Sequence, residues 1–284
     1  MASSSVQADR RPAGRRLSQR TAGGVGPLGL GIATLWLSLI VLLPLAAISA
    51  KAFDNGISGF FDAIDLPAAR AALLVTVGVS LVVAVINVVL GTLIAWVLVR
   101  DEFPGKRFVN ALIDLPFALP TIVASMVLLS LYGPQSPFDV QLNATRPALV
   151  IALLFVTLPF VVRAVQPVLL ELDKEVEEAA ASLGASSATT FRRIILPALL
   201  PAILTGTGLA FTRAIGEYGS VVLIGGGVPR KTEVASQYIQ KQIEIDRVVN
   251  AAAVSFALLV IAFSVLFLLR VVSSRATKRE EAAR

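Results

Sequence analysis

The chain has 284 residues, of which 56% are hydrophobic and only 15% are charged. A soluble domain carries about a quarter charged residues, so this composition indicates a protein whose surroundings are mainly lipid. The absence of cysteine and histidine excludes disulfides, thiol chemistry and metal sites built from thiolate or imidazole ligands. The net charge of +6 does not indicate nucleic acid, because the basic residues lie at the ends of apolar segments and not among aromatic side chains.

Six apolar segments are long enough to cross a bilayer, which takes about 20 residues of helix. They are Leu28–Ala50, Ala71–Val99, Val109–Tyr132, Ala148–Leu170, Ile195–Ile224 and Val248–Val272. We therefore expect an all-α polytopic membrane protein with a transmembrane permease domain over residues 28–272. A basic, disordered tail is expected over residues 1–27 and a second tail over residues 273–284.

The distribution of lysine and arginine predicts the orientation. Of the 25 basic residues, 16 flank the spans on the side of the two chain ends and seven lie on the other side. Both termini are therefore expected to be cytoplasmic. A cleaved signal peptide ending near Ala50 is the alternative, but the first apolar run is long for a signal core, and cleavage would leave an odd number of spans.

A polar segment separates the fourth and fifth spans. Residues 170–183 carry apolar side chains at helical intervals, which predicts a short amphipathic helix. Gly184 is suited to the left-handed turn that ends such a helix, and Ser186 or Ser187 can cap the next one. The segment can be a solvated hairpin or, because its alanines allow close approach, a docking surface.

Prolines and charges inside the spans are candidates for a transport pathway. Pro116 and Pro120 interrupt the third span and predict either a packing kink or a gate. Arg213 and Glu217 lie four residues apart, so they can neutralise one another or face the pathway. Arg163 is expected to extend to the lipid headgroups or to contact an anion, and Asp114 is open to both structural and functional interpretations.

One motif has a long and specific spacing. Glu178-Ala179-Ala180, Gly184 and Ile194-Ile195-Leu196-Pro197 resemble the EAA loop of ABC-importer permeases, E-A-A-x3-G-x9-I-x-L-P. The resemblance implies a type I permease fold in which this loop forms a coupling helix on an ATP-hydrolysing subunit. The implied ATPase-coupling residues are Glu178, Ala179, Ala180, Gly184, Ile194, Leu196 and Pro197.

Further stretches narrow the resemblance to the T-type permease subunit of the bacterial sulfate/thiosulfate ABC importer. They are DLPFALPTIVAS (114–125), LYGP (131–134), TLPFVVRAVQPVL (157–169), RAIGEYGSVVLIGG (213–226) and TEVASQYIQKQIE (232–244). The resemblance implies a bacterial inner-membrane location and four kinds of partner: a second homologous permease, two ATPase subunits, an extracytoplasmic sulfate-binding protein and membrane lipid. The pathway or gate candidates are Asp114, Pro116, Pro120, Arg213, Gly216, Glu217, Tyr218 and Gly219.

Catalysis and cofactors are not expected in this chain. The stretch GGGVPRKT (225–232) lacks the glycine before lysine that a phosphate-binding loop requires, so ATP and magnesium are expected on the partner ATPase. A permease for molybdate or another oxyanion is a close alternative. A secondary transporter driven through Asp114, Glu217 and Arg213 is a more distant one, because it leaves the loop unexplained, and a non-transporting membrane scaffold explains neither the broken span nor the charges within spans.

Overall fold

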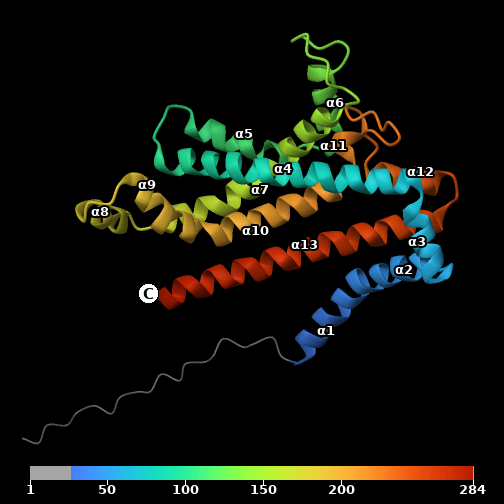
Figure 1. The fold of residues 1–284 in the computed structure, drawn as a ribbon, viewed down its shortest axis with the longest axis horizontal. Coiled ribbons are helices and arrows are strands. Elements are labelled where there is room, and N and C mark those ends of the chain that lie inside the picture. The colour runs from blue at the N-terminus through green and yellow to red at the C-terminus, as the bar shows by residue number, and fades with distance from the viewer. Residues whose placement is uncertain (1–26, 284) are drawn as a thin grey trace, which may run out of the picture. The chain divides into compact units, whose positions relative to one another are not determined.

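The computed structural model describes the backbone of residues 27–283 and the side chains of residues 28–274. Every regular element in this part of the chain is a helix, which confirms the all-α prediction (Figure 1). The predicted tail over residues 1–27 lies outside the described residues except for Pro27. In chain order the elements are α1 (Pro27–Leu37), the π-helix η1 (Ser38–Leu42), α2 (Leu43–Ala52), α3 (Gly56–Asp65), α4 (Pro67–Arg100), α5 (Lys106–Ala118), α6 (Thr121–Tyr132), α7 (Arg146–Glu171), α8 (Lys174–Ser182), α9 (Ser187–Thr190), the π-helix η2 (Phe191–Ile195), α10 (Leu196–Ile215), α11 (Gly219–Val222), α12 (Ala235–Glu244) and α13 (Val248–Ala283).

The described residues contain five helical segments that are long and apolar enough to cross a membrane, and a bent helix pair makes up a sixth candidate. All six correspond to the segments predicted from hydropathy. The five are Leu28–Ala52, Pro67–Arg100, Arg146–Glu171, Ser187–Ile215 and Val248–Ser274. The fold is therefore that of a polytopic helical membrane protein.

The chain divides into two compact units, residues 1–46 and residues 47–284. In the described part of the first unit, α1, η1 and the start of α2 form one continuous apolar helix. Its large side chains are exposed, including Leu35 at 66% and Ile40 at 62%. A helix that is apolar on all sides is suited to contact with lipid or with another apolar helix.

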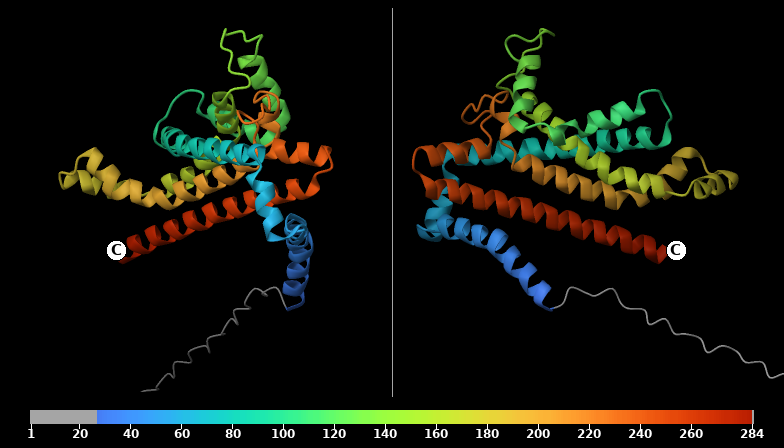
Figure 2. Two further views of the ribbon diagram at one scale, coloured as in Figure 1. Left: turned by 45° about the vertical axis from the view of Figure 1, so that its right-hand side comes forward. Right: turned by 180° about the vertical axis from the view of Figure 1, so that it is seen from behind.

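Helices α4, α7 and α10 form the core of the second unit, and α13 packs along α10 (Figures 1 and 2). Val83, Leu149 and Leu199 are fully buried between them. One polar contact joins α4 to α7: the side-chain amide of Asn87 donates to the Thr157 hydroxyl at 2.7 Å. Hydrogen bonds of this kind between spans are worth about 0.6 kcal/mol on average in a bilayer, so apolar packing contributes most of the association.

The third span is broken into α5 and α6, whose axes differ in direction by 114°. Leu119 and Pro120 between them have extended backbone, with ψ near 130°. Proline disfavours helical conformation in the residue before it, so Pro120 ends α5 at this point. The span expected over residues 109–132 is therefore a pair of helices joined at a sharp bend, and the predicted proline break within it is confirmed at Pro120. Pro116 remains inside α5 and is buried.

The fifth span ends earlier than expected, at Ile215 and not at Ile224. Gly216 follows α10, and the chain then turns into the four-residue helix α11. The turn is stabilised by Glu217, whose carboxylate accepts a hydrogen bond from the Ser220 backbone N–H at 2.7 Å. The hydropathy of the sequence does not reveal this break, because every residue of α11 except Ser220 is apolar or glycine, so the apolar run continues past the end of α10.

Two short helices, α3 and α12, lie at the end of the bundle opposite α8 (Figure 1). We refer to these ends as the α12 end and the α8 end. Helix α3 was not predicted. It is attached through aromatic contacts, since the Phe60 ring stacks on Phe53 at 4.6 Å and meets the edge of Phe256 on α13 at 5.8 Å. Contacts of this kind contribute about 0.5–1.5 kcal/mol each beyond the area that they bury.

Candidate functional site

Residues 171–197, which we call the α8–α9 segment, form a helical hairpin at the α8 end. Asp173 caps α8 by accepting a hydrogen bond at 3.0 Å from the backbone N–H two residues on. Gly184 ends the turn after α8 with φ of +84°. Ser186 caps α9 and accepts a backbone N–H from its first turn at 3.3 Å. The predicted helix, glycine turn and serine cap are confirmed, although α8 begins at Lys174 and not at Leu170.

Helix α8 contributes no buried residue to the structure. Glu178 and Ala179 are exposed, and Leu183 at the tip is 89% exposed. Val176 adds a second apolar side chain at 47% exposure. Exposed apolar side chains beside alanines, on a helix that leaves its own bundle, are typical of a surface that binds a partner.

The α8–α9 segment is attached to α4 by two contacts that the sequence did not predict. Glu177 forms an ion pair with Arg100 at the end of α4. The Arg100 guanidinium also lies over the Trp96 ring, 5.4 Å from its centre, and Trp96 meets Phe191 edge-on at 5.7 Å. The exposed helix is therefore connected to the second span as well as to the fourth and fifth. The sequence gives no signal for this pair, because Arg100 is followed directly by Asp101 and Glu102, and Glu177 lies 77 residues away.

The last two residues of the motif, Leu196 and Pro197, lie inside a helix and not at its start, where the expected span from Ile195 placed them. The span begins at Ser187, and residues 191–195 form a π turn in which the N–H of Leu196 bonds to the carbonyl of Phe191. Pro197 has no N–H and its ring crowds the preceding turn. A π turn accommodates such a residue without ending the helix.

The break in the third span lies against the Gly216–Gly219 stretch that follows α10. Gly219 packs directly on Thr121 at the start of α6. The Ser125 hydroxyl on α6 accepts the backbone N–H groups of Leu223 and Ile224 at 3.1 and 3.2 Å. A side chain of the broken third span therefore satisfies two backbone N–H groups of the irregular segment that follows α10, as apolar surroundings require.

Replacing Gly219 by alanine is expected to destabilise the protein by about 1–3 kcal/mol or more. A β-carbon there would approach the Ile122 backbone nitrogen and the Thr121 β-carbon to 3.0 Å, so α11 would have to move away from α6. Gly216→Ala is the matched control, because its β-carbon would meet no heavy atom closer than 3.8 Å. The midpoint of thermal unfolding of the purified protein measures the difference, and equal midpoints for the two variants would contradict the packing argument.

Arg213 and Glu217 form an ion pair, so the predicted neutralisation across four residues is confirmed. Glu217 is 3% exposed and accepts the Ser220 N–H as well. Its backbone carbonyl accepts the Ser236 hydroxyl on α12 at 2.7 Å. This one residue therefore links α10, α11 and α12. Arg213 is 35% exposed on its side chain and leaves part of the guanidinium accessible.

The stretch over residues 232–244 folds over the α12 end and is also built on buried polar groups. Glu233 is 4% exposed and lies 3.7 Å from the Lys241 ammonium. Burial raises the pKa of the Tyr238 phenol above its usual value of 10.0, and the neighbouring Glu233 carboxylate raises it further. Tyr238 is therefore neutral at physiological pH and packs as part of the core.

The expectation that Arg163 extends to the headgroups is wrong. Its guanidinium binds both carboxylate oxygens of Asp114 on α5, at 2.7 and 2.6 Å. It also donates to Asn110 and to Gln166. A bidentate arginine–carboxylate pair is geometrically specific, so this contact holds the first half of the broken span against α7. Asp114 was named as a candidate, while Asn110 was missed because one asparagine in an apolar run carries no periodic signal.

The candidate residues therefore do not form one site. Glu178, Ala179, Ala180 and Gly184 belong to the α8 end, and Ile194, Leu196 and Pro197 belong to the helix that leads from it. Gly219 meets Thr121, directly after Pro120, where α11 packs on α6, while Asp114 and Pro116 lie within α5. Tyr218 is half-buried between α10 and α11.

Comparison with known proteins identifies the family. Residues 87–278 match the family described as "Binding-protein-dependent transport system inner membrane component". The chain belongs to this family. It is 42% identical over 239 residues to the "Probable sulfate transport system permease protein cysT" of Nephroselmis olivacea, covering 82% of this chain and 84% of that one. It is 44% identical over 220 residues to the "Sulfate transport system permease protein CysT" of Synechocystis, covering 75% and 77%.

A solved structure shows the same fold. The "Crystal structure of bacterial alginate ABC transporter in complex with alginate pentasaccharide-bound periplasmic protein" superposes with a TM-score of 0.73 over 88% of this chain and 93% of that one. Sequence identity is 17%, so the likeness concerns the fold alone. The predicted ABC-importer permease fold and the resemblance to the sulfate permease subunits are confirmed by these comparisons.

Proposed function

We propose that this chain is the permease subunit of an ATP-driven importer for sulfate and thiosulfate. The observation that carries the proposal is its 42–44% identity, over most of the chain, to proteins named as sulfate transport system permeases. The chain acts as a transport subunit without catalysis of its own, and a partner subunit binds and hydrolyses ATP with magnesium.

Coupling to that ATPase runs through the α8–α9 segment. Its exposed helix, free of buried residues, offers a docking surface in which Glu178 faces outward. The Glu177–Arg100 ion pair and the continuous helix from Ser187 to Ile215 support transmission from this surface into the second and fifth spans. Movement of α8 by the ATPase pair would then shift these spans together.

The translocation pathway is formed with the second permease, and the broken span lies beside it. Non-helical backbone at membrane depth is tolerated where it is buried in protein or lines a water-filled cavity, and Gly219 meets Thr121, the residue after Pro120, at such a place. The charge of Arg213 is largely neutralised by Glu217, so a dianion would be held only transiently. Rapid release is what conduction requires, and selectivity then rests mainly with the binding protein.

The complex contains a second homologous permease, two ATPase subunits and an extracytoplasmic sulfate-binding protein, all within or at the bacterial inner membrane. Both termini and the α8 end are cytoplasmic, and the α12 end receives the binding protein. The excess of basic residues at the α8 end supports this orientation.

Two alternatives differ in what they require. A permease for molybdate or another oxyanion shares every structural feature described above and differs in its binding protein. An ion-coupled secondary transporter would use Asp114, Arg213 and Glu217, but these charges are already engaged in ion pairs, and it would give α8 no partner.

Uptake of radiolabelled sulfate tests the proposal in cells that lack this chain and any redundant importer. Expression of the intact chain is expected to restore uptake, and excess unlabelled thiosulfate, but not phosphate, is expected to suppress it. Unchanged sulfate uptake on deletion would overturn the substrate assignment. Uptake that persists in cells without the partner ATPase would overturn ATP coupling.

A further inference from the structure

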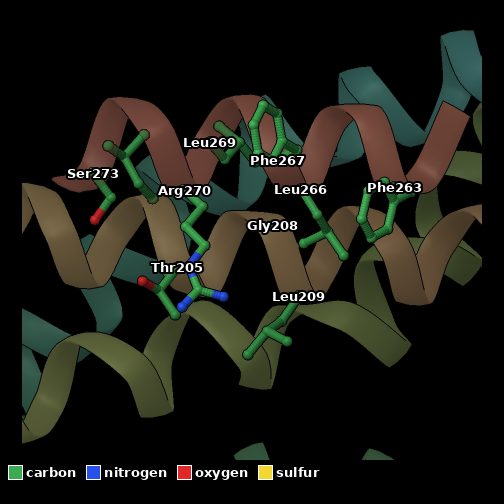
Figure 3. Close-up of a pocket in the computed structure, with 10 residues that line it drawn as sticks. Thr205, Gly208, Leu209, Phe263, Leu266, Phe267, Leu269, Arg270 and Ser273 are labelled. Atoms are coloured by element: carbon green, nitrogen blue, oxygen red, sulfur yellow. The ribbon is translucent and has the colours of Figure 1, made fainter. Parts of the chain in front are cut away.

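Helices α10 and α13 enclose a groove of about 420 Å³ on the outer face of the second unit (Figure 3). We call it the α10–α13 groove. Its walls are apolar for most of their length, and one end carries polar groups. Its lining includes Thr205, Gly208 and Leu209 from α10 and Phe263, Phe267 and Arg270 from α13.

The apolar side chains that line the groove are exposed at the surface of the second unit. Phe263 is 69% exposed, Phe267 59% and Leu209 47%. Gly208 is buried and lets α13 approach α10 closely, because a β-carbon there would lie 3.2 Å from Leu266 and 3.3 Å from Leu269. An open apolar channel of this shape between two spans is suited to an acyl chain.

Arg270 closes one end of the groove. Figure 3 shows its side chain extending from α13 towards α10, beside Thr205. Within the described residues, the guanidinium has no ion pair or hydrogen bond, and no acidic side chain is among those lining the groove. The planar guanidinium is well suited to bind a phosphate through two hydrogen bonds. An unpaired positive charge beside apolar walls is complementary to an amphipathic ligand with an anionic group and an apolar chain.

The position of Arg270 along α13 matches the depth of lipid headgroups. It lies 22 residues after Val248, which corresponds to about 33 Å of helix, and the hydrocarbon core is about 30 Å thick. Phe263 lies seven residues earlier, about 10 Å deeper in the hydrocarbon. The guanidinium is therefore at phosphate level, with the apolar walls at acyl-chain level.

We propose that the α10–α13 groove binds an anionic phospholipid from the leaflet at the α8 end, with its phosphate on Arg270 and an acyl chain along the exposed Leu209 and Phe263. Basic pockets between spans recognise anionic headgroups in this way. An apolar helix from another subunit could cover the walls, but it would leave the arginine without a counter-ion. The proposed orientation makes this leaflet cytoplasmic.

The test uses the complete importer complex, purified in detergent and analysed by native mass spectrometry after incubation with phosphatidylglycerol or phosphatidylcholine. Arg270→Gln is expected to weaken phosphatidylglycerol binding about fivefold, the effect of one basic residue near a lipid headgroup. Arg107→Gln is the matched control, since it removes one exposed charge from the α8 end outside the groove. Phosphatidylcholine binding is expected to change little in either variant.

A second variant tests the apolar part of the groove while keeping the charge. Leu209→Trp adds bulk at an exposed lining position and is expected to lower the occupancy of both lipids. Equal phosphatidylglycerol binding by the intact complex and Arg270→Gln would overturn the proposal. Absence of lipid from the intact complex, with a partner subunit cross-linked to a cysteine placed at position 209, would overturn it too and identify the groove as a subunit interface.

Discussion

Replacement of Gly184 by glutamate is expected to lower sulfate uptake by at least about tenfold. Gly184 has φ of +84°, and a residue with a β-carbon in left-handed conformation costs about 1–2 kcal/mol. Because this turn holds α8 in the conformation proposed to dock, a cost of about 1.4 kcal/mol would lower the population of that conformation tenfold. There is open space around the position, so the added side chain projects outward onto the proposed ATPase surface. The complex is expected to assemble in the membrane, because α8 contributes no buried residue. Initial uptake rates and ATPase activity in the same preparations measure the effect.

Two matched variants separate docking from strain. Gly184→Asn is expected to transport nearly normally, because asparagine tolerates the left-handed conformation. Gly105, in the loop before α5, has φ of +86° and equally open surroundings. Gly105→Glu therefore imposes the same strain and the same charge away from the α8–α9 segment, and near-normal uptake is expected. Normal uptake by Gly184→Glu, or an equal loss in Gly105→Glu, would show that this turn has no special role.

Replacement of Arg213 by methionine is expected to have the second large effect, a loss of folded protein from the membrane. Arg213→Met leaves the Glu217 carboxylate, 3% exposed, without its counter-ion. Removing one partner of a buried ion pair costs about 3–5 kcal/mol, and Glu217 also holds α11 through the Ser220 N–H. We expect the amount of folded protein in the membrane to fall sharply, as measured by fluorescence-detected size-exclusion chromatography of solubilised membranes.

The double variant Arg213→Met, Glu217→Gln distinguishes a structural pair from a pathway pair. Glutamine can still accept the Ser220 N–H, and no buried charge remains, so the amount of folded protein is expected to recover. Uptake is expected to remain low, because the accessible part of the Arg213 guanidinium is lost from the proposed pathway. Full recovery of both folding and uptake would assign the pair to structure alone.

The candidate site was predictable from the sequence where one local segment carries the whole signal. Gly184 needs a left-handed turn whatever surrounds it, and Ser186 caps the helix that directly follows, so both could be named in advance. The bidentate contact between Arg163 and Asp114 could not be predicted in this way. Two charges 49 residues apart in different spans have no local signature, and headgroup contact for Arg163 was the simplest inference. Arg100 and Glu177 escaped prediction for the same reason.

Hydropathy by itself determined that this chain crosses a membrane as helices, because each span must satisfy its own backbone hydrogen bonds within about 20 apolar residues. It also located Pro120, whose effect on the preceding residue is local. Only the tertiary structure decided that the third span bends by 114° and that the fifth ends at Ile215. At these breaks Gly219 packs on Thr121, and the Ser125 hydroxyl accepts the backbone N–H groups of Leu223 and Ile224, which would otherwise be unsatisfied in lipid. Apolar composition indicates that a segment lies in the membrane, whereas the contacts between segments determine the residue at which its helix ends.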